Sequence, residues 1–363
     1  MSPTVTITKK QKKIEDISIR SSDSMLKALK RMDSTLKRLL LVFEGSRFLN
    51  VLSIGDIQRA IIRNEPLSTP VEAILRQDTI VAHTSDTAQK IGKRMLECRI
   101  ECMPVLNDAK ELADVYFWED IFVEKEKQPP QRFNIPVVVM AGGFGTRLKP
   151  LTNVIPKPLI PIGQKTMLEE IFDRFARHGC DAFFLSVNYK SELIKYYLSC
   201  QGLPYEIDYF IEDKPLGTAG SLTLLKGKIH QTFFVNNCDI LIEEDYAEIL
   251  KYHHENKNEI TLVAALKTYP IPYGTIDTGH NGALRGIREK PELTFKINSG
   301  MYILEPHLLD EIPEGDFFHI TDLIHKVKAR DGKVGVFPVS EGSWKDIGNW
   351  EQYLSKINVS NGL

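Results

Sequence analysis

Apolar residues in the second half of the chain fall into short runs that alternate between two spacings. Residues 135–140 form a continuous, β-branched run, which is typical of a strand buried on both faces. Residues 166–178 carry apolar side chains at helical spacing and are followed by Gly179, a residue type that commonly ends helices. The same reasoning predicts strands at 181–188, 205–211, 232–236 and 260–266, and helices from 191, at 217–226 and at 246–254. This alternation predicts an α/β domain with a mainly parallel sheet, helices on both faces and ligands beyond the carboxyl ends of the strands.

A weaker pattern occurs twice in the first 125 residues. Each copy reads as helix, strand, turn, strand and helix over roughly 50–60 residues, which indicates an internal repeat of a small α/β unit. The first copy has a helix at 24–32, strands at 38–43 and 48–52, and a helix at 57–63. The second copy has a helix at 87–97, strands at 102–106 and 112–116, and a helix from 119.

A charged segment with two adjacent prolines, residues 124–132, separates the two patterns. It has no apolar anchor, so we expect an exposed and fairly stiff linker. We therefore predict a repeat domain over 1–125, a linker over 126–134 and a larger domain over 135–363. A length of 363 residues is consistent with two or three domains.

Charge and composition exclude several classes of protein. The formal net charge is -2, with 22 Lys+Arg and 19 Asp+Glu in residues 1–133 and 24 and 29 in the remainder. That balance argues against a nucleic-acid partner, because nucleic-acid-binding domains are usually basic. No apolar run is long enough for a membrane span, and the polar, lysine-rich start does not read as a secretory signal. Five scattered cysteines argue against a disulfide framework, so we expect a cytoplasmic protein.

A glycine-rich segment directly after the first strand of the larger domain is the strongest chemical signal. Gly142, Gly143 and Gly145 can bring backbone N–H groups close to an anion, and Arg147 adds a cation suited to phosphate. The spacing matches neither the P-loop nor the dinucleotide-binding fingerprint. Ten residues after Arg147, Lys157 lies between two prolines that keep the chain extended. The segment therefore predicts a phosphate site.

The combined pattern is Gly-Gly-x-Gly-Thr-Arg-Leu-x-Pro-Leu-Thr followed by Pro-Lys-Pro-Leu. It closely resembles the signature of the sugar-1-phosphate nucleotidylyltransferases, especially the mannose-1-phosphate guanylyltransferase branch. The resemblance implies a Rossmann-like, GT-A-like domain that makes an NDP-sugar and pyrophosphate from a nucleoside triphosphate and a sugar 1-phosphate. It implies that Arg147, Lys157 and Asp239 are catalytic. Asp239 and Asp346 would hold Mg²⁺, which commonly takes one or two carboxylates together with substrate phosphates.

Further residues match the family in order along the chain. The resemblance places the nucleotide at Ala141, Gly142, Gly143, Gly145, Thr146, Glu212, Gly217, Thr218 and Gly220. It places the sugar phosphate at Asn188, Gly274, Glu289, Lys290 and Asn298. Glu212 stands where the family contacts the base. Because a carboxylate can accept both N–H groups on the guanine edge, Glu212 favours GTP, with either a mannose or a glucosamine 1-phosphate as co-substrate.

The segment Ser53-Ile-Gly-Asp56 resembles the end of a cystathionine-β-synthase-type (CBS) domain. That resemblance implies a CBS-domain pair in which the Ser53 hydroxyl meets a nucleotide phosphate and Asp56 takes ribose hydroxyls, at a helix N-terminus that favours anions. The second copy has no hydroxyl at the matching position, Phe117, so we expect at most one regulatory adenine-nucleotide site. The alternative is that Ser53 and Asp56 cap a helix and that the repeat is structural or dimerising.

Other interpretations of the whole chain stay open. One is a uridylyl- or thymidylyltransferase acting on a hexose or amino-sugar 1-phosphate. Another is a non-catalytic regulatory homologue that binds sugar nucleotides, which the presence of both cations and both aspartates disfavours. A third is an adenine-nucleotide sensor that gates the enzyme. We also expect a homo-oligomer, and we expect His253 and His254 to be solvated on a polar helix.

Overall fold

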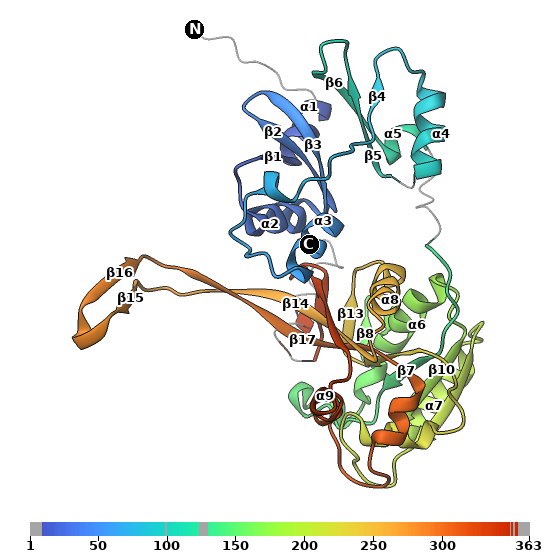
Figure 1. Cartoon of the computed structure of the whole chain (residues 1–363). Coiled ribbons are helices and arrows are strands. Elements are labelled where there is room, and N and C mark those ends of the chain that lie inside the picture. The colour runs from blue at the N-terminus through green and yellow to red at the C-terminus, as the bar shows by residue number, and fades with distance from the viewer. Residues whose placement is uncertain (1–8, 99, 123–129, 349, 351–352, 355–363) are drawn as a thin grey trace. The chain divides into compact units, whose positions relative to one another are not determined.

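The computed structural model of the chain divides into two compact units, Met1–Pro129 and Pro130–Leu363 (Figure 1). The structure describes residues 9–98, 100–122, 130–348, 350 and 353–354. The predicted linker at 126–134 therefore lies partly outside the described residues.

The N-terminal unit contains two three-stranded sheets with the same strand order. They are built from β1 (Ser18–Arg20), β2 (Leu39–Glu44) and β3 (Arg47–Ser53), and from β4 (Ala82–His83), β5 (Cys102–Leu106) and β6 (Leu112–Phe117). In each sheet the first two strands are parallel and the last two antiparallel. The helices are α1 (Lys9–Asp16), α2 (Met25–Thr35), α3 (Ile54–Ile62), α4 (Ala88–Cys98) and α5 (Trp118–Ile121). The matching order agrees with the predicted repeat; β1 and β4 were not predicted because two or three residues are too few for a periodic pattern.

A seven-stranded sheet forms the centre of the C-terminal unit, in the order β11-β10-β7-β12-β17-β14-β18. The strands are β7 (Val137–Met140), β10 (Ala182–Val187), β11 (Glu206–Ile211), β12 (Phe233–Asn237), β14 (Ile260–Pro270), β17 (Glu292–Leu304) and β18 (Val334–Val339). Only β17 runs antiparallel to its neighbours, and the other four pairings are parallel. The predicted mainly parallel sheet is confirmed.

Helices cover both faces of this sheet. Successive side chains at the start of β12 are apolar and point to opposite faces, so each face needs a covering layer. Phe233 and Val235 point into a core that includes Leu323 of α9 (Ile320–Ala329). Phe234 points to the opposite face, where its ring meets Phe175 of α6 (Met167–Arg177) and Tyr246 of α8 (Tyr246–Glu255). Successive strand residues face opposite sides, so one strand serves both cores. Among the described residues of this unit, the other long helix is α7 (Ser191–Cys200).

Two predictions about this unit are wrong. The helix predicted at 217–226 is a short 3₁₀ helix, η5 (Gly220–Leu225), because the two glycines at its start pack against another backbone segment. His253 is buried rather than solvated: Nδ1 lies 2.8 Å from the Thr261 hydroxyl and Nε2 lies 3.0 Å from a Glu305 carboxylate oxygen. Burial lowers the pKa of His253, which favours a neutral ring that fastens α8 to the sheet.

The two longest strands, β14 and β17, leave the sheet and continue outward as a pair (Figure 1). β18 pairs with β14 only over 260–265, and β12 pairs with β17 only over 301–304. β14 and β17 stay paired as far as Pro270 and Glu292, and β15 (Thr275–Thr278) and β16 (Leu284–Arg288) form the outer end. We call residues 266–297 the arm. The sequence did not predict it.

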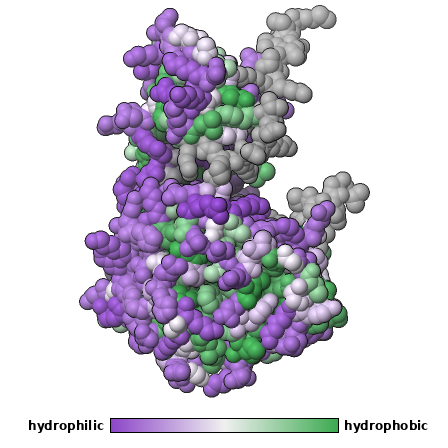
Figure 2. All heavy atoms as spheres, turned by 90° about the vertical axis from the view of Figure 1, so that its right-hand side faces the viewer, coloured by the Kyte–Doolittle hydropathy of each residue, from purple (hydrophilic) through white to green (hydrophobic). Residues whose placement is uncertain are grey.

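The surface is mainly hydrophilic on the face shown in Figure 2, with apolar patches between the polar side chains. Within the described ranges, no helix is long and apolar enough to cross a membrane.

Candidate functional site

The predicted phosphate loop begins where β7 ends. β10, β7 and β12 are parallel neighbours, so their carboxyl ends lie along one edge of the sheet. Ala141 N–H donates to Ser186 C=O at 3.0 Å, and Cys238 N–H donates to Met140 C=O at 3.2 Å. These bonds hold the loop between the ends of its two neighbouring strands. The edge is the one where α/β sheets usually bind ligands.

Gly145 lets the loop fold back on the segment that carries Lys157. Its φ is 64°, in the left-handed region that favours glycine. A Cβ there would stand 2.7 Å from Thr152 Cγ2 and 3.1 Å from Lys157 Cβ, and the Thr152 hydroxyl donates to Gly145 C=O at 3.0 Å. Gly143 is different, since nothing lies within 4 Å of its Cβ position. The loop is thus tightly packed at Gly145 and open at Gly143, and Thr146 follows at the start of η2 (Thr146–Leu148).

Two cations from this segment meet one aspartate from β12's end. Lys157 Nζ forms an ion pair with Asp239 Oδ2, and Arg147 Nη2 lies 3.6 Å from the same oxygen. The Lys157 and Asp239 side chains are only 12% and 9% exposed, whereas Arg147 is 61% exposed. Lys157 and Asp239 are therefore held in place, while Arg147 is available to an incoming anion.

The second predicted metal aspartate lies beside the first. β13 (Ile240–Ile242) pairs antiparallel with β19 (Trp344–Asp346), and Ile347 N–H donates to Asp239 C=O at 2.9 Å. A Cβ on Gly348 would stand 2.5 Å from Asp239 Oδ2, 2.8 Å from Asp346 Oδ1 and 2.9 Å from Arg147 Nη2. The two carboxylates and the guanidinium thus surround one glycine. Sequence reasoning did not select Gly348, because the close approach of side chains to a glycine leaves no spacing pattern.

Glu212 anchors several segments rather than pointing freely outward. Its carboxylate is buried; the Ser186 hydroxyl donates to one oxygen and Leu216 N–H donates to the other at 3.1 Å. A Cβ on Gly142 would stand 2.9 Å from Oε1, so this glycine is needed for the close approach. Asn188 donates its side-chain N–H to Glu212 C=O at 2.6 Å. Glu212 and Asn188 therefore form one cluster under the phosphate loop.

The predicted second nucleotide loop has a structural partner. Cβ atoms on Gly217 and Gly220 would stand 2.6 Å from Phe318 C=O and Asp316 C=O. The Thr218 hydroxyl accepts a hydrogen bond from Ile320 N–H at 2.9 Å, at the first turn of α9. These residues fasten η5 to the start of α9. This packing explains why Gly217, Thr218 and Gly220 are small, whether or not a nucleotide also contacts them.

The predicted sugar-phosphate residues lie in separate parts of the unit. Asn298 lies at the base of the arm, where its Oδ1 accepts a hydrogen bond from Gly300 N–H at 3.2 Å. Gly274, Glu289 and Lys290 lie farther out, between the two halves of the arm. The register is unbroken from Asn298 to Glu292, and six strand residues span about 20 Å.

In the N-terminal unit, Ser53 and Asp56 form a capping box at the start of α3. Ser53 N–H donates to Asp56 Oδ2 at 2.8 Å, and Asp56 N–H donates to Ser53 Oγ at 3.3 Å. Arg59 and Arg76 both pair with Asp56 Oδ1. Burial opposes ionisation of Asp56, but the hydrogen bonds from Arg76 and Ser53 outweigh it and lower its pKa. The contacts are those of the capping alternative, and the carboxylate is fully engaged.

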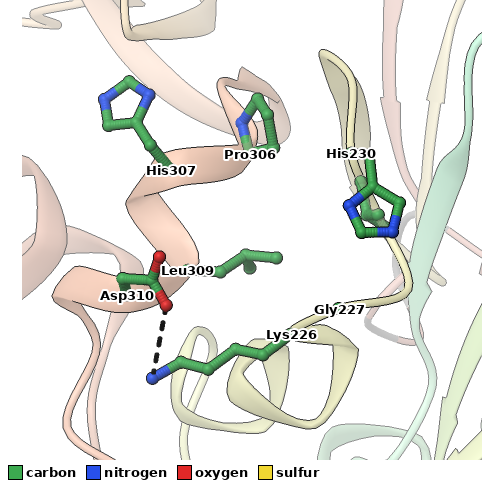
Figure 3. A pocket seen from close by; sticks show the side chains of 8 residues that line it. Lys226, Gly227, His230, Pro306, His307, Leu309 and Asp310 are labelled. Carbon is green, nitrogen blue, oxygen red and sulfur yellow. Dashed lines mark ion pairs between the residues drawn. The ribbon is translucent and has the colours of Figure 1, made fainter.

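Two other features among the described residues fall outside the predicted site. A surface pocket lies between the segment after η5 and η7 (Pro306–Glu311), with Lys226 and Asp310 3.9 Å apart across it (Figure 3). Beside it, Glu259, His307 and Glu311 come close enough to suggest metal ligands. Arg330 pairs with both carboxylates, however, and lowers the pKa of Glu259 to about 2. This cluster is therefore a charge-compensated surface network.

The fold and the edge site define a nucleotide-handling α/β domain, and comparison with known proteins gives its family. The chain belongs to the nucleotidyl transferase family, whose model matches residues 136–360. It is 34% identical over 227 residues to a mannose-1-phosphate guanyltransferase of Schizosaccharomyces pombe, covering 60% of this chain and 62% of the relative. It is 30% identical over 225 residues to a mannose-1-phosphate guanylyltransferase of Mycobacterium tuberculosis, covering 61% and 63%. The chain thus spans less than two thirds of the length of these relatives.

One solved structure supports the fold alone. A Bacillus anthracis protein provisionally named a glucose-1-phosphate thymidylyltransferase, solved in complex with a sucrose, superimposes with a TM-score of 0.50. The sequences are 20% identical, and the match covers 63% of this chain and 96% of that one.

Proposed function

We propose that the C-terminal unit transfers a nucleotidyl group from a nucleoside triphosphate to a sugar 1-phosphate. The observation that carries this proposal is the convergence of Arg147, Lys157, Asp239 and Asp346, from three separate segments, at one strand edge beside a glycine-rich loop. Membership in the nucleotidyl transferase family supports the same reaction.

In the reaction, a phosphate oxygen of the sugar 1-phosphate forms a bond to the α-phosphorus of the triphosphate. The bond from the α-phosphorus to the bridging oxygen breaks, and pyrophosphate leaves with the electron pair. No general base is needed, because the attacking phosphate is already an anion near neutral pH. The protein contributes position and charge compensation, which dominate enzymatic phosphoryl and nucleotidyl transfer.

The chain's own cations have distinct parts in this proposal. Lys157, fixed by its ion pair with Asp239, would meet the α-phosphate. Arg147, largely exposed, would bind the departing phosphates through its planar guanidinium. The open backbone at Gly143 leaves room for the triphosphate to approach the loop.

The two aspartates fit Mg²⁺. Asp239 and Asp346 turn carboxylate oxygens toward the same small space beside Gly348, and hard oxygen donors are what Mg²⁺ prefers. Bound there with substrate phosphates, the ion would supply further charge neutralisation. A divalent cation would share Asp239 with Lys157, so we expect nucleotide and metal to bind together rather than singly.

We propose GTP as the nucleotide and mannose 1-phosphate as the first sugar phosphate to test. The names of the curated relatives support both choices. A matrix of GTP, UTP, dTTP and CTP against mannose, glucosamine and glucose 1-phosphates tests the proposal by pyrophosphate release. Turnover of UTP or dTTP alone would favour the uridylyl- or thymidylyltransferase alternative, and no turnover with bound sugar nucleotide would favour the regulatory one.

We further propose that the N-terminal unit is a CBS-type pair. The two sheets of identical topology and the Ser53–Asp56 motif support this. Because Asp56 is engaged by two arginines, a nucleotide ribose would have to displace at least one of them. Calorimetry of the full chain with AMP and ATP tests this site; absence of heat for both would leave a structural role.

A further inference from the structure

The inner part of the arm exposes a stripe of large apolar side chains. Tyr269 lies directly opposite Leu293, and Phe295 lies two residues farther along β17. In an antiparallel pair, opposite residues and alternate residues share a face, so all three project from the same side. The Tyr269 and Phe295 rings approach to 6.1 Å between centroids. All three side chains are exposed.

The outer part of the arm repeats this exposure. Ile276 of β15 lies opposite Ile287 of β16, and the two residues are 66% and 62% exposed. β15 and β16 pair with each other as a separate two-stranded sheet. A lone two-stranded hairpin is marginally stable in water, and contiguous apolar surface usually marks an interface. The arm therefore has the properties of a segment that another surface covers.

A kink between the two parts holds three of the five residues predicted for the sugar phosphate, Gly274, Glu289 and Lys290. Ile271 N–H donates to Pro291 C=O at 2.9 Å and closes the kink. A Cβ on Gly274 would stand 3.0 Å from Glu289 Oε2, and Lys290 has a φ of 43° in the left-handed region. The kink thus carries a carboxylate and an ammonium group on consecutive residues. Those groups suit the hydroxyls and phosphate of a sugar 1-phosphate.

The arm starts at the candidate site but carries these groups away from it. A Cβ on Gly300 would stand 2.6 Å from Asn237 Nδ2, so the base of the arm adjoins the end of β12. From Asn298 the strand runs outward for about 20 Å before it reaches the kink. Glu289 and Lys290 therefore lie just beyond the outer end of β17, on the part of the arm that points away from the sheet (Figure 1).

We propose that two copies of the chain exchange arms, so that Glu289 and Lys290 of one copy complete the sugar-phosphate site of the other. The inference rests on the proposed function for the identity of the ligand. In each copy, the strand edge carries the groups proposed to bind the nucleotide, including Arg147 and Asp239, and the arm carries the groups proposed to bind the sugar phosphate, Glu289 and Lys290. In a two-fold symmetric dimer each arm would reach the strand edge of the other copy, so both sites would be completed at once. Exchange of an identical element between two copies is also a low-cost route to a dimer. The apolar face of the arm would be buried in the same step.

Complementation between two defective chains tests the exchange. Asp239→Asn removes the nucleotide-side carboxylate, and Lys290→Glu reverses the sugar-phosphate cation; each variant alone is expected to be inactive. Co-expressed with different tags and purified through both, the mixed dimer would contain one site with both halves intact. We expect about half of the wild-type rate per dimer. A mixed dimer without activity, or failure to isolate one, would overturn the proposal in favour of an arm that acts within its own chain or on another protein.

A second measurement does not depend on activity. Ile276→Asp combined with Ile287→Asp places charges where a single chain leaves both side chains in solvent, so the fold should survive. We expect the dimer dissociation constant, from sedimentation, to rise at least tenfold. The matched control is Tyr196→Asp on α7, an exposed apolar position away from the arm. Equal association of the two proteins would contradict arm exchange. If the wild-type chain turned over no substrate pair, the proposed function would fail. This measurement alone would then decide whether the arms mediate dimer formation.

Discussion

Gly348 approaches the Asp239 carboxylate so closely that a Cβ at this position would stand 2.5 Å from Oδ2. The same methyl group would stand 2.8 Å from Asp346 Oδ1. Gly348→Ala should therefore push the two carboxylates apart without removing any functional group. Because displacements of about 1 Å can cost about 100-fold in rate, we expect a loss of that order in pyrophosphate release. Gly55→Ala, where a Cβ makes only ordinary contacts, is the control; equal activity of the two variants would argue against the site.

Asp239→Asn keeps the size of the side chain and removes its charge. Lys157, only 12% exposed, then loses its ionic partner, and a Mg²⁺ bound as proposed would lose one of its two carboxylates. We expect pyrophosphate release to fall at least about 100-fold, as when one group that stabilises the transition state is deleted. Circular dichroism should show an intact fold. Near-normal turnover in this variant would contradict the mechanism.

Glu212→Gln separates base recognition from positioning. The new amide can accept from Leu216 N–H through its oxygen and donate to the Ser186 hydroxyl oxygen through its N–H₂ group, so only the extra strength of the charged acceptor is lost and we expect a stability loss of about 1 kcal/mol. If the carboxylate also reads guanine, kcat/KM should fall at least tenfold more for GTP than for UTP. An equal fall for both nucleotides would leave Glu212 with a positioning role alone.

Glu243 should make the C-terminal unit sensitive to acid. Arg174 and Lys345 donate to the same oxygen at 2.7 and 2.8 Å, and the Arg174 hydrogen bond is the largest cause of a pKa lowered to about 2. A depressed carboxyl pKa gives stability that is complete above the ordinary value of 4.5 and is lost as pH falls toward about 2. In urea titrations between pH 6 and 2, Glu243→Gln should flatten this dependence. The exposed Glu206→Gln should not change it.

Ser53→Ala tests the capping box in the N-terminal unit. The hydroxyl accepts from Asp56 N–H and donates to Asp56 Oδ2, so its removal should destabilise that unit by about 1 kcal/mol. The change should appear in thermal unfolding with and without adenine nucleotides. If AMP or ATP stabilises the wild-type chain and not the variant, the hydroxyl also has a ligand-binding role.

Most helices and strands of the C-terminal unit could be predicted from the sequence, because their buried faces leave a regular pattern of apolar residues. The uninterrupted apolar run before the glycine loop predicts β7, and the order of motifs brings Asp239 and Asp346 to one edge. The arm was missed for the opposite reason. Lys267, Thr268 and Tyr269 have solvent on at least one side, so no alternation of apolar and polar residues reveals a strand. The partners of Glu212 and Gly217 were missed because close backbone approaches leave no spacing pattern.

The pairing of β13 with β19 has a consequence for how the protein is made. The last strand of the seven-stranded sheet ends at Val339, so the sheet can be complete before Asp346 has left the ribosome. Only when β19 adds to β13 does the second carboxylate arrive beside Asp239. A nascent or truncated chain that ends before residue 344 would lack β19 and would offer only one of the two carboxylates proposed to hold Mg²⁺. The proposed site would thus be completed only after translation has passed this strand.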